Sequence, residues 1–286
     1  MYVALRLFCE QHMDKMKVGL IGCGNIGADL CIALQRGLIP AQIAALTDMD
    51  DERARLLQRT FNLNASICDL EENAQESDIL FECAAPEAVR DIVEVGAAHH
   101  RDCLVMSVGG LMENPGLFGL ARDANIRIWI PSGALCGLDG IRSAVEAGLH
   151  TVILTTRKPP MAIDGTEYLL EKGIDLSSLK EPKVVFQGSA REACKAFPKN
   201  VNVAAALSFA GIGPDETKVR VIADPKATVN VHEIFAEGAF GQLTTVTQNL
   251  PSPRNPKSSY LASLSAIAEL RMIAEVFVAH QRVQRA

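Results

Sequence analysis

The segment from Lys17 to Gln35 constrains the fold of this 286-residue chain more than any other. A short apolar run, Lys-Val-Gly-Leu-Ile, leads into Gly-Cys-Gly-Asn-Ile-Gly at residues 22–27, and a helical pattern follows at once. Glycines at these spacings permit a tight turn, and the turn leaves the N-terminus of the helix open to an anion. The segment therefore predicts a buried strand, a glycine-rich turn and a helix.

Up to Ile130 the sequence alternates such strands with helical stretches. The expected strands are apolar throughout, which is typical of strands covered on both faces. They are Lys17–Ile21, Gln42–Leu46, Ala65–Cys68, Asp78–Ala84, Cys103–Val108 and Ile126–Ile130. This alternation predicts an α/β domain, a doubly wound parallel sheet of the Rossmann type.

The pattern changes after Gly148, where the expected strands are longer and alternate apolar with polar residues. They are Thr151–Thr156, Lys183–Gln187, Lys218–Ala223, Val229–Ala236 and Gly241–Gln248. Such alternation favours a second α+β domain, with a mostly antiparallel sheet that has one open face.

Four segments are expected along the chain. Residues 1–15 form an N-terminal tail, and residues 16–136 form the Rossmann domain. Residues 137–256 form a substrate-binding, catalytic α+β domain. The helical stripe of residues 257–286 is expected to pack back on the Rossmann domain.

Composition excludes several classes of protein. The net charge of −6 does not suit a nucleic-acid partner, because neutralising phosphates needs a basic face. No apolar stretch reaches the roughly 20 residues of a membrane span. Eight cysteines without a C-x-x-C pair fit neither a metal site nor a disulfide framework, so a reducing, cytoplasmic location is expected.

The glycine motif is followed by Asp48, at the end of the next strand, about 20 residues further on. This context is typical of dinucleotide binding, with the pyrophosphate at the helix N-terminus and the carboxylate on the ribose hydroxyls. A 2′-phosphate would be repelled by Asp48, which favours NAD over NADP. A structural turn followed by a chance aspartate is the alternative. The expected contacts are Gly22, Gly24, Asn25, Ile26, Gly27 and Asp48.

The nicotinamide end is expected beyond the carboxyl ends of the fourth to sixth strands, where the strand order reverses. Small residues there leave room for a ring, although simple tight turns would need them too. The candidates are Cys83, Ala84 and Ala85, then Gly109 within Ser107–Gly110, and Ala134 after Pro131–Gly133.

Of six histidines, His232 alone lies in the middle of an expected strand. Alternation places it on the same face as Asn230, and a polar pair in an apolar strand suggests a function. The alternative is a hydrogen-bonded histidine on an open sheet face. Asn202 starts a small-residue helix after Pro-Lys-Asn, and there helix capping is the alternative.

Taken in order, these motifs resemble those of the L-aspartate dehydrogenase family, from Met16 to the terminal helix. They are Gly-Cys-Gly-Asn-Ile-Gly at 22–27, Ser-Val-Gly-Gly-Leu at 107–111, Pro-Ser-Gly-Ala at 131–134, Pro-Lys-Asn-Val-Asn-Val-Ala-Ala at 198–205 and Asn-Val-His-Glu-Ile at 230–234. The resemblance implies NAD(P)-dependent oxidation of L-aspartate to iminoaspartate. That product either feeds quinolinate and NAD synthesis or hydrolyses to oxaloacetate and ammonia.

The resemblance also implies that His232 is the catalytic acid/base, that Asn202 and Ala134 contact the dinucleotide, and that the enzyme is a homodimer using NAD or NADP. An imidazole titrating near neutrality suits proton removal from the amine. Two substrate carboxylates need cations or N–H groups. The candidates are Lys199, Asn200, the helix start at Asn202, and Arg220, although solvated surface charge is the alternative.

Other two-domain dehydrogenases, such as homoserine dehydrogenase or dihydrodipicolinate reductase, are the nearest alternatives, and their substrate-domain motifs are absent here. Outside enzymes, the alternative is a dinucleotide-binding sensor without turnover, which would not need a proton acceptor.

Overall fold

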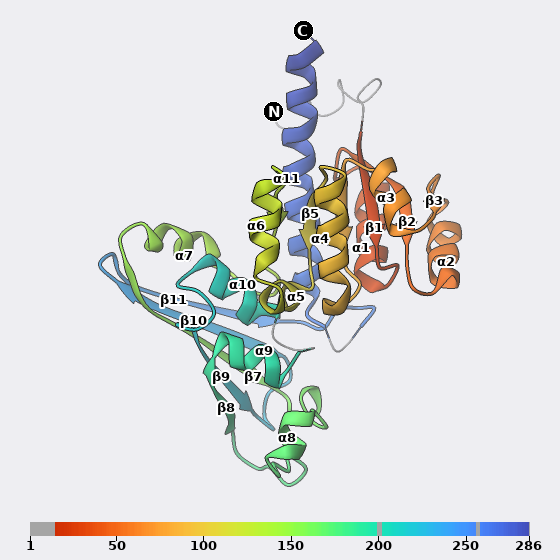
Figure 1. Cartoon of the computed structure of the whole chain (residues 1–286). Helices are drawn as coiled ribbons and strands as arrows, with labels where there is room; N and C mark the ends of the chain where they lie inside the picture. Colours follow the sequence, from red (N-terminus) through yellow and green to blue (C-terminus); the bar gives the residue numbers. More distant parts are fainter. Residues whose placement is uncertain (1–14, 199–201, 256–257, 286) are drawn as a thin grey trace, which may run out of the picture. The chain divides into compact units, whose positions relative to one another are not determined.

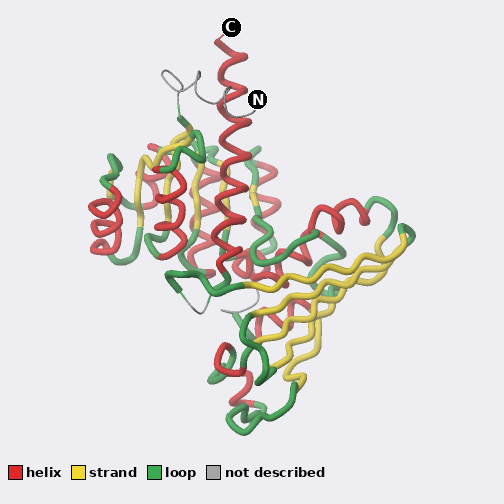
Figure 2. Tube along the Cα trace, turned by 180° about the vertical axis from the view of Figure 1, so that it is seen from behind, coloured by secondary structure: helices red, strands yellow, loops and turns green. Residues whose placement is uncertain are grey.

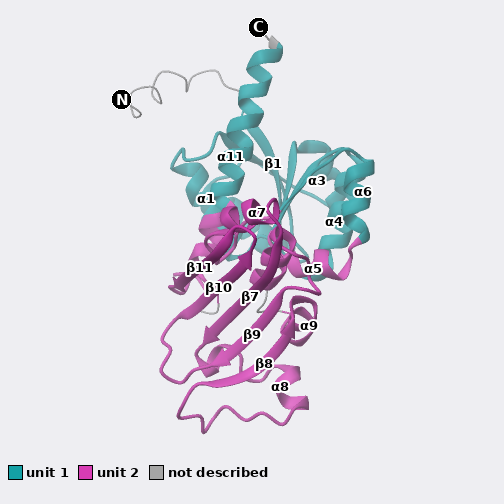
Figure 3. Cartoon of the chain, turned by 90° about the vertical axis from the view of Figure 1, so that its left-hand side faces the viewer, with its two compact units in different colours: residues 1–105, 116–129, 267–286 teal, residues 106–115, 130–266 magenta. Residues whose placement is uncertain are grey.

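The computed structural model describes residues 15–198, 202–255 and 258–285. The chain divides into two compact units (Figure 3). The first unit lies within Met1–Val105, Gly116–Trp129 and Ile267–Ala286, and the second within Met106–Pro115 and Ile130–Ala266. The domain boundaries expected from the sequence stay predictions.

The first unit is built around a six-stranded sheet with the order β3-β2-β1-β4-β5-β6, in which every pair of neighbours is parallel. The strands are β1 (Met16–Ile21), β2 (Ala41–Thr47), β3 (Ser66–Ile67), β4 (Ile79–Glu82), β5 (Asp102–Val105) and β6 (Ile128–Trp129). The helices are α1 (Asn25–Gln35), α2 (Asp51–Phe61), α3 (Leu70–Glu76), η1 (Pro86–Ala88), α4 (Val89–Ala98), α6 (Gly116–Asp123) and the part of α11 (Tyr260–Arg285) that begins at Ile267.

This sheet confirms the predicted doubly wound fold. Val18, Leu20, Leu80 and Leu104 are fully removed from solvent, as expected for strands covered on both faces. The strand order reverses between β1 and β4, whose carboxyl ends therefore lie together at the place where ligands bind in such sheets.

The second unit holds a five-stranded mixed sheet with the order β11-β10-β7-β9-β8. Only the β7–β9 pair is parallel, so the prediction of a mostly antiparallel sheet is confirmed. The strands are β7 (Leu149–Lys158), β8 (Lys183–Ser189), β9 (Lys218–Ala223), β10 (Asn230–Gly238) and β11 (Gly241–Asn249). The helices are α5 (Val108–Glu113), α7 (Leu138–Val145), η2 (Pro160–Ala162), α8 (Glu167–Glu171), α9 (Ala190–Ala196), α10 (Asn202–Ala210) and the first turns of α11.

One face of this sheet, the inner face, is covered by α7, α9 and α10 (Figure 1). Along β7 it presents Val152, Leu154, Thr156 and Lys158, all buried. Gly211, which follows α10, packs against Val152. Residues in between, such as Thr155, are partly exposed on the outer face, over which none of the described helices of this unit lies (Figure 2). The alternation of burial follows the two-residue period of a strand.

Some elements differ from the sequence-based expectation. The fifth strand ends at Val105 rather than Val108, because Val108 begins the short helix α5. Helices α3, α7, α8 and α9 were not predicted. The start of α9 carries a capping box, in which Ser189 and Glu192 exchange hydrogen bonds with each other's backbone N–H. Within the described residues, no helix has the length and apolar character that a membrane crossing needs.

Candidate functional site

The glycine-rich turn connects β1 to α1 as predicted. Gly22 adopts φ +98°, and its N–H donates to Thr47 O at 2.9 Å. Gly24 is the N-cap of α1, where no side chain caps the helix and the first turn carries no acidic residue. The first N–H groups of α1 are thus arranged as in a phosphate-binding helix start.

The glycines of this turn have different structural requirements. A Cβ at Gly22 would lie 2.6 Å from the Cys83 carbonyl carbon, and one at Gly27 would lie 3.0 Å from Gly22 O. A Cβ at Gly24 would meet no atom of the chain within 4 Å. The fold itself explains the glycines at 22 and 27. The open space at Gly24 fits a pyrophosphate that approaches the backbone.

Asp48 lies directly after β2, against the same turn. Its Oδ2 accepts the Cys23 N–H at 2.7 Å, and its Oδ1 accepts the Asp50 N–H at 3.0 Å. The structure thus brings Asp48 to the glycine-rich turn. A carboxylate has about four lone-pair sites, so these two bonds leave acceptor capacity for ribose hydroxyls.

Residues 83–85 form the turn after β4, beside Gly22. The Cys83 thiol donates to Gly22 O at 3.0 Å, and burial raises the pKa of this thiol well above its usual value. The buried Glu82 carboxylate accepts the Ala84 N–H at 2.8 Å. The predicted residues Cys83, Ala84 and Ala85 therefore lie where β1 and β4 end together.

In the second unit, Asn202 is the first residue of α10, and its Oδ1 accepts the Gly109 N–H of α5 at 3.1 Å. This contact joins two segments that the sequence analysis had proposed separately for the cofactor. The predicted Lys199 and Asn200 lie outside the described residues.

Ala134 is buried in the loop before α7, and its carbonyl accepts the Asn249 Nδ2–H at 3.1 Å. Asn249 ends β11, opposite Asn230 of β10, and is 3% exposed. Sequence reasoning missed Asn249, although it stands two residues beyond Thr247 in the alternating pattern of that strand.

His232 lies on the inner face, 3% exposed. Its Nδ1 is 3.1 Å from Thr156 Oγ1, the side chain opposite it on β7. The alternative of a histidine on an open sheet face is therefore not what the structure has. Burial, and then the positive charge of Lys158, lower the pKa of His232 to about 3, whereas the sequence analysis expected titration near neutrality.

Lys158 is a residue of this neighbourhood that sequence reasoning missed. It ends β7 on the same face as Thr156, and burial lowers the pKa of its ammonium to about 8. The sequence could have indicated it, because Lys158 continues the alternation of Leu154 and Thr156 two residues past the expected end of the strand. We call the following set the polar half of the inner face: Thr156, Lys158, Asn230, His232, Thr247 and Asn249.

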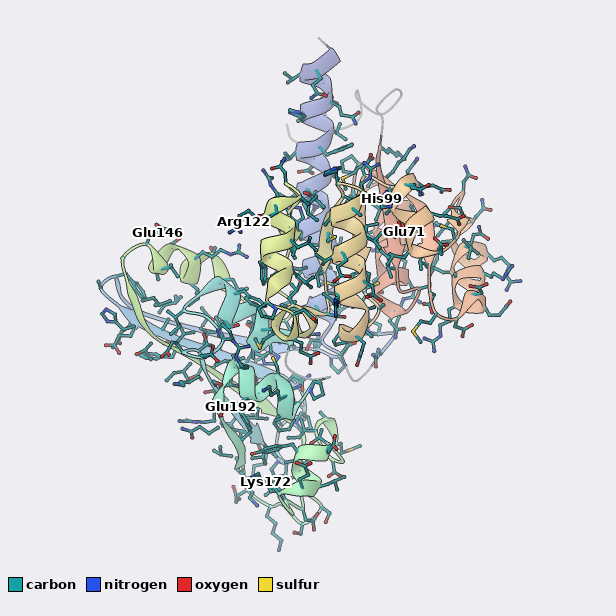
Figure 4. The ribbon with its side chains drawn as sticks, viewed as in Figure 1. Glu71, His99, Arg122, Glu146, Lys172 and Glu192 are labelled. Carbon is teal, nitrogen blue, oxygen red and sulfur yellow. The ribbon has the colours of Figure 1, made fainter. Side chains whose placement is uncertain are left out.

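Arg220, which the sequence analysis proposed for the substrate carboxylates, does not lie on this face of the sheet. It is exposed on β9 between the buried Val219 and Val221, which places its side chain on the outer face. Another histidine, His99, points at Glu71 in the first unit, with 2.6 Å between Nε2 and Oε2 (Figure 4). That pair is an exposed surface contact, and His232 stays the candidate proton carrier.

Two family models match different parts of the chain. Residues 139–273 match a family model described as aspartate dehydrogenase, C-terminal. Residues 22–131 match a model described as homoserine dehydrogenase, NAD binding domain. The first match spans the whole polar half of the inner face, and the second spans the glycine-rich turn and Asp48.

Whole-chain relatives agree. L-aspartate dehydrogenase of Methanosarcina mazei is 47% identical over 262 residues, which are 90% of this chain and 97% of that protein. The enzyme of Methanosarcina barkeri is 47% identical over 264 residues, with the same coverage. The crystal structure of aspartate dehydrogenase from Thermotoga maritima has the same fold, with a TM-score of 0.64 at 24% identity, over 91% of this chain and 94% of that one. The resemblance predicted from the motifs is confirmed, and the chain belongs to the L-aspartate dehydrogenase family of nicotinamide-dependent oxidoreductases.

Proposed function

We propose that this protein oxidises L-aspartate to iminoaspartate with NAD or NADP, and that His232 is the acid/base of the reaction. The observation that carries the proposal is the buried His232 on the polar half of the inner face, bonded to Thr156. An imidazole removed from water and held by a neighbour is oriented for one proton transfer. The names of the relatives supply the substrate.

The proposed reaction needs two transfers from the substrate. A nicotinamide dinucleotide held by the first unit would supply the acceptor for the hydride that leaves C2 of aspartate. His232 takes a proton from the ammonium group, so that the nitrogen lone pair forms the C=N bond as the C2–H bond breaks. For Nε2 to accept this proton, Nδ1 must carry the ring hydrogen and donate it to Thr156 Oγ1. The Thr156 hydroxyl can accept that hydrogen bond, which leaves Nε2 available to take the proton.

Iminoaspartate released into water would hydrolyse to oxaloacetate and ammonia, and captured by another enzyme it would enter quinolinate and NAD synthesis. Two hydrogen bonds fix segments of the second unit. The Gly109 N–H donates to Asn202 Oδ1, and the Asn249 side chain donates to the Ala134 carbonyl. We propose that these two contacts keep the nicotinamide-binding loops in place.

The proposal is tested by an absorbance assay for reduced nicotinamide, with the full-length protein and a panel of amino acids. Aspartate is expected to give turnover, while glutamate, alanine and homoserine are expected to give none. Turnover with homoserine alone would instead assign the protein to the homoserine dehydrogenases. Cofactor binding without turnover on any amino acid would favour the sensor alternative.

A second prediction concerns cofactor choice, for which Asp48 supports NAD. Replacing Asp48 with asparagine keeps an oxygen for the Cys23 N–H and removes the charge that repels a 2′-phosphate. Asp48→Asn is expected to raise the kcat/KM ratio of NADP to NAD about tenfold, equal to ~1.4 kcal/mol of lost repulsion. The matched control is Asp51→Asn, on the exposed first turn of α2. An unchanged ratio in Asp48→Asn would count against the ribose contact.

We also propose that the enzyme is a cytoplasmic homodimer. The outer face of the second-unit sheet carries apolar side chains, among them Ile153, Phe235 and Val246, which would suit a second copy of the chain. All seven described cysteines are free thiols, which supports a reducing compartment. Sedimentation equilibrium of the wild-type protein tests the dimer.

A further inference from the structure

Lys158 is a cation at an unusual position. Among the residues that the structure describes, it is the only lysine or arginine that is buried, at 6% exposure. Its neighbour on the other face, Arg157, is bonded to Asp224 at 2.9 Å. Arg157 thus lies on the outer face, and Lys158 lies on the inner face.

Lys158 lies near His232 on the same face of the sheet. Both side chains emerge from the inner face, on the adjacent strands β7 and β10, and Lys158 stands two residues beyond the histidine's partner Thr156. The positive charge of Lys158 is felt at the imidazole, where it lowers the pKa. The other members of the polar half, Thr156, Asn230, Thr247 and Asn249, are neutral.

Burial of an ammonium group is costly, because water solvates the charge better than the interior does. The same low dielectric strengthens the attraction between the Lys158 ammonium and an anion that binds beside it. L-aspartate, the substrate proposed above, carries two carboxylates, one of them attached to the carbon that bears the amine. A cation beside the proton acceptor is therefore within the span of one substrate molecule.

We propose that the Lys158 ammonium binds a carboxylate of the amino-acid substrate beside the His232 imidazole. This inference rests on the proposed function, since it assumes that the site accepts an acidic amino acid. It also links substrate binding to the proton transfer that follows. A carboxylate bound to Lys158 cancels the charge that opposes protonation of His232, so substrate binding prepares the imidazole to accept the proton.

The test is Lys158→Met, which keeps the length of the side chain and removes its charge. With saturating NAD, the KM for aspartate is expected to rise roughly 10- to 100-fold, the range of one charge-assisted hydrogen bond. The inhibition constant of succinate, a dicarboxylate without the amine, is expected to rise by a similar factor. The dissociation constant of NADH is expected to stay within about twofold. Lys158→Arg is expected to restore part of the loss, because it restores the charge.

The control is Lys218→Met, at an exposed position of β9, which is expected to leave all three constants unchanged. A Lys158→Met variant that keeps its aspartate KM and succinate inhibition would overturn the proposal. So would a loss of kcat alone that arginine does not repair, because that pattern marks a proton carrier. If wild-type protein does not oxidise aspartate, the proposed function fails separately. Calorimetry of succinate binding to the protein with NAD then still tests Lys158 without turnover.

Discussion

His232→Gln is expected to lower kcat for aspartate oxidation by about 10²- to 10⁴-fold, the usual contribution of a positioned acid/base. Glutamine fills a similar volume and can bond Thr156, but it cannot carry a proton at any working pH. The dissociation constant of NADH, measured by fluorescence, is expected to change less than about threefold, since the predicted contacts to the dinucleotide come from other residues. A variant with wild-type kcat would remove His232 from the mechanism.

Thr156→Val is the matched control for this substitution. It removes the hydrogen-bond partner of Nδ1 but leaves the imidazole in place. A loss of about tenfold in kcat is expected, clearly smaller than that of His232→Gln. Equal losses in the two variants would mean that the pair acts through packing and not through proton transfer.

The buried imidazole also gives the wild-type protein a pH signature. The folded-state pKa is about 3 and the ordinary value is 6.5, so below pH 6.5 the unfolded chain takes up a proton at His232 that the folded chain does not. The free energy of unfolding therefore falls as the pH drops from 6.5 toward 3. Denaturant titrations of His232→Gln are expected to lack this part of the pH dependence, whether or not the variant is active.

The first unit could be predicted closely from sequence because its signals are local. The turn at residues 22–27 lies directly between β1 and α1 in the sequence, and Asp48 directly follows the next strand, β2. Parallel strands with helical crossovers leave few topologies to choose from. Their carboxyl ends therefore came together as expected.

The second unit was harder to predict. Alternation of polar and apolar residues assigns side chains to two faces of a strand, but it does not show which face the helices cover. Asn230 and His232 were assigned to one face correctly, and the helices that make it the inner face come from elsewhere in the chain. Arg220 seemed a suitable cation by charge alone, yet its place in β9 puts it on the outer face. Lys158 was overlooked because the expected strand ended two residues too early.

Substitutions in the glycine-rich turn are expected to have the second large effect. Replacing Gly22 should reduce stability, whereas replacing Gly24 should reduce cofactor affinity. Gly22→Ala is expected to lower the free energy of unfolding by at least about 2 kcal/mol. The reasons are φ +98° at this residue and a new Cβ 2.6 Å from the Cys83 carbonyl carbon, which is main chain and cannot turn away. Thermal unfolding measures the loss, which should occur without any cofactor present.

Gly24→Ala is the matched variant with the opposite expectation. Its backbone, at φ −88° and ψ −151°, suits alanine, and the added Cβ meets no atom of the chain within 4 Å. Stability is expected to change by less than about 1 kcal/mol. The methyl group occupies the space through which a pyrophosphate would approach the N–H groups of α1, so NADH affinity is expected to fall about tenfold or more, ~1.4 kcal/mol. If Gly24→Ala binds NADH as tightly as wild type, residues 22–27 are only a structural turn, and the dinucleotide must be held elsewhere in the chain.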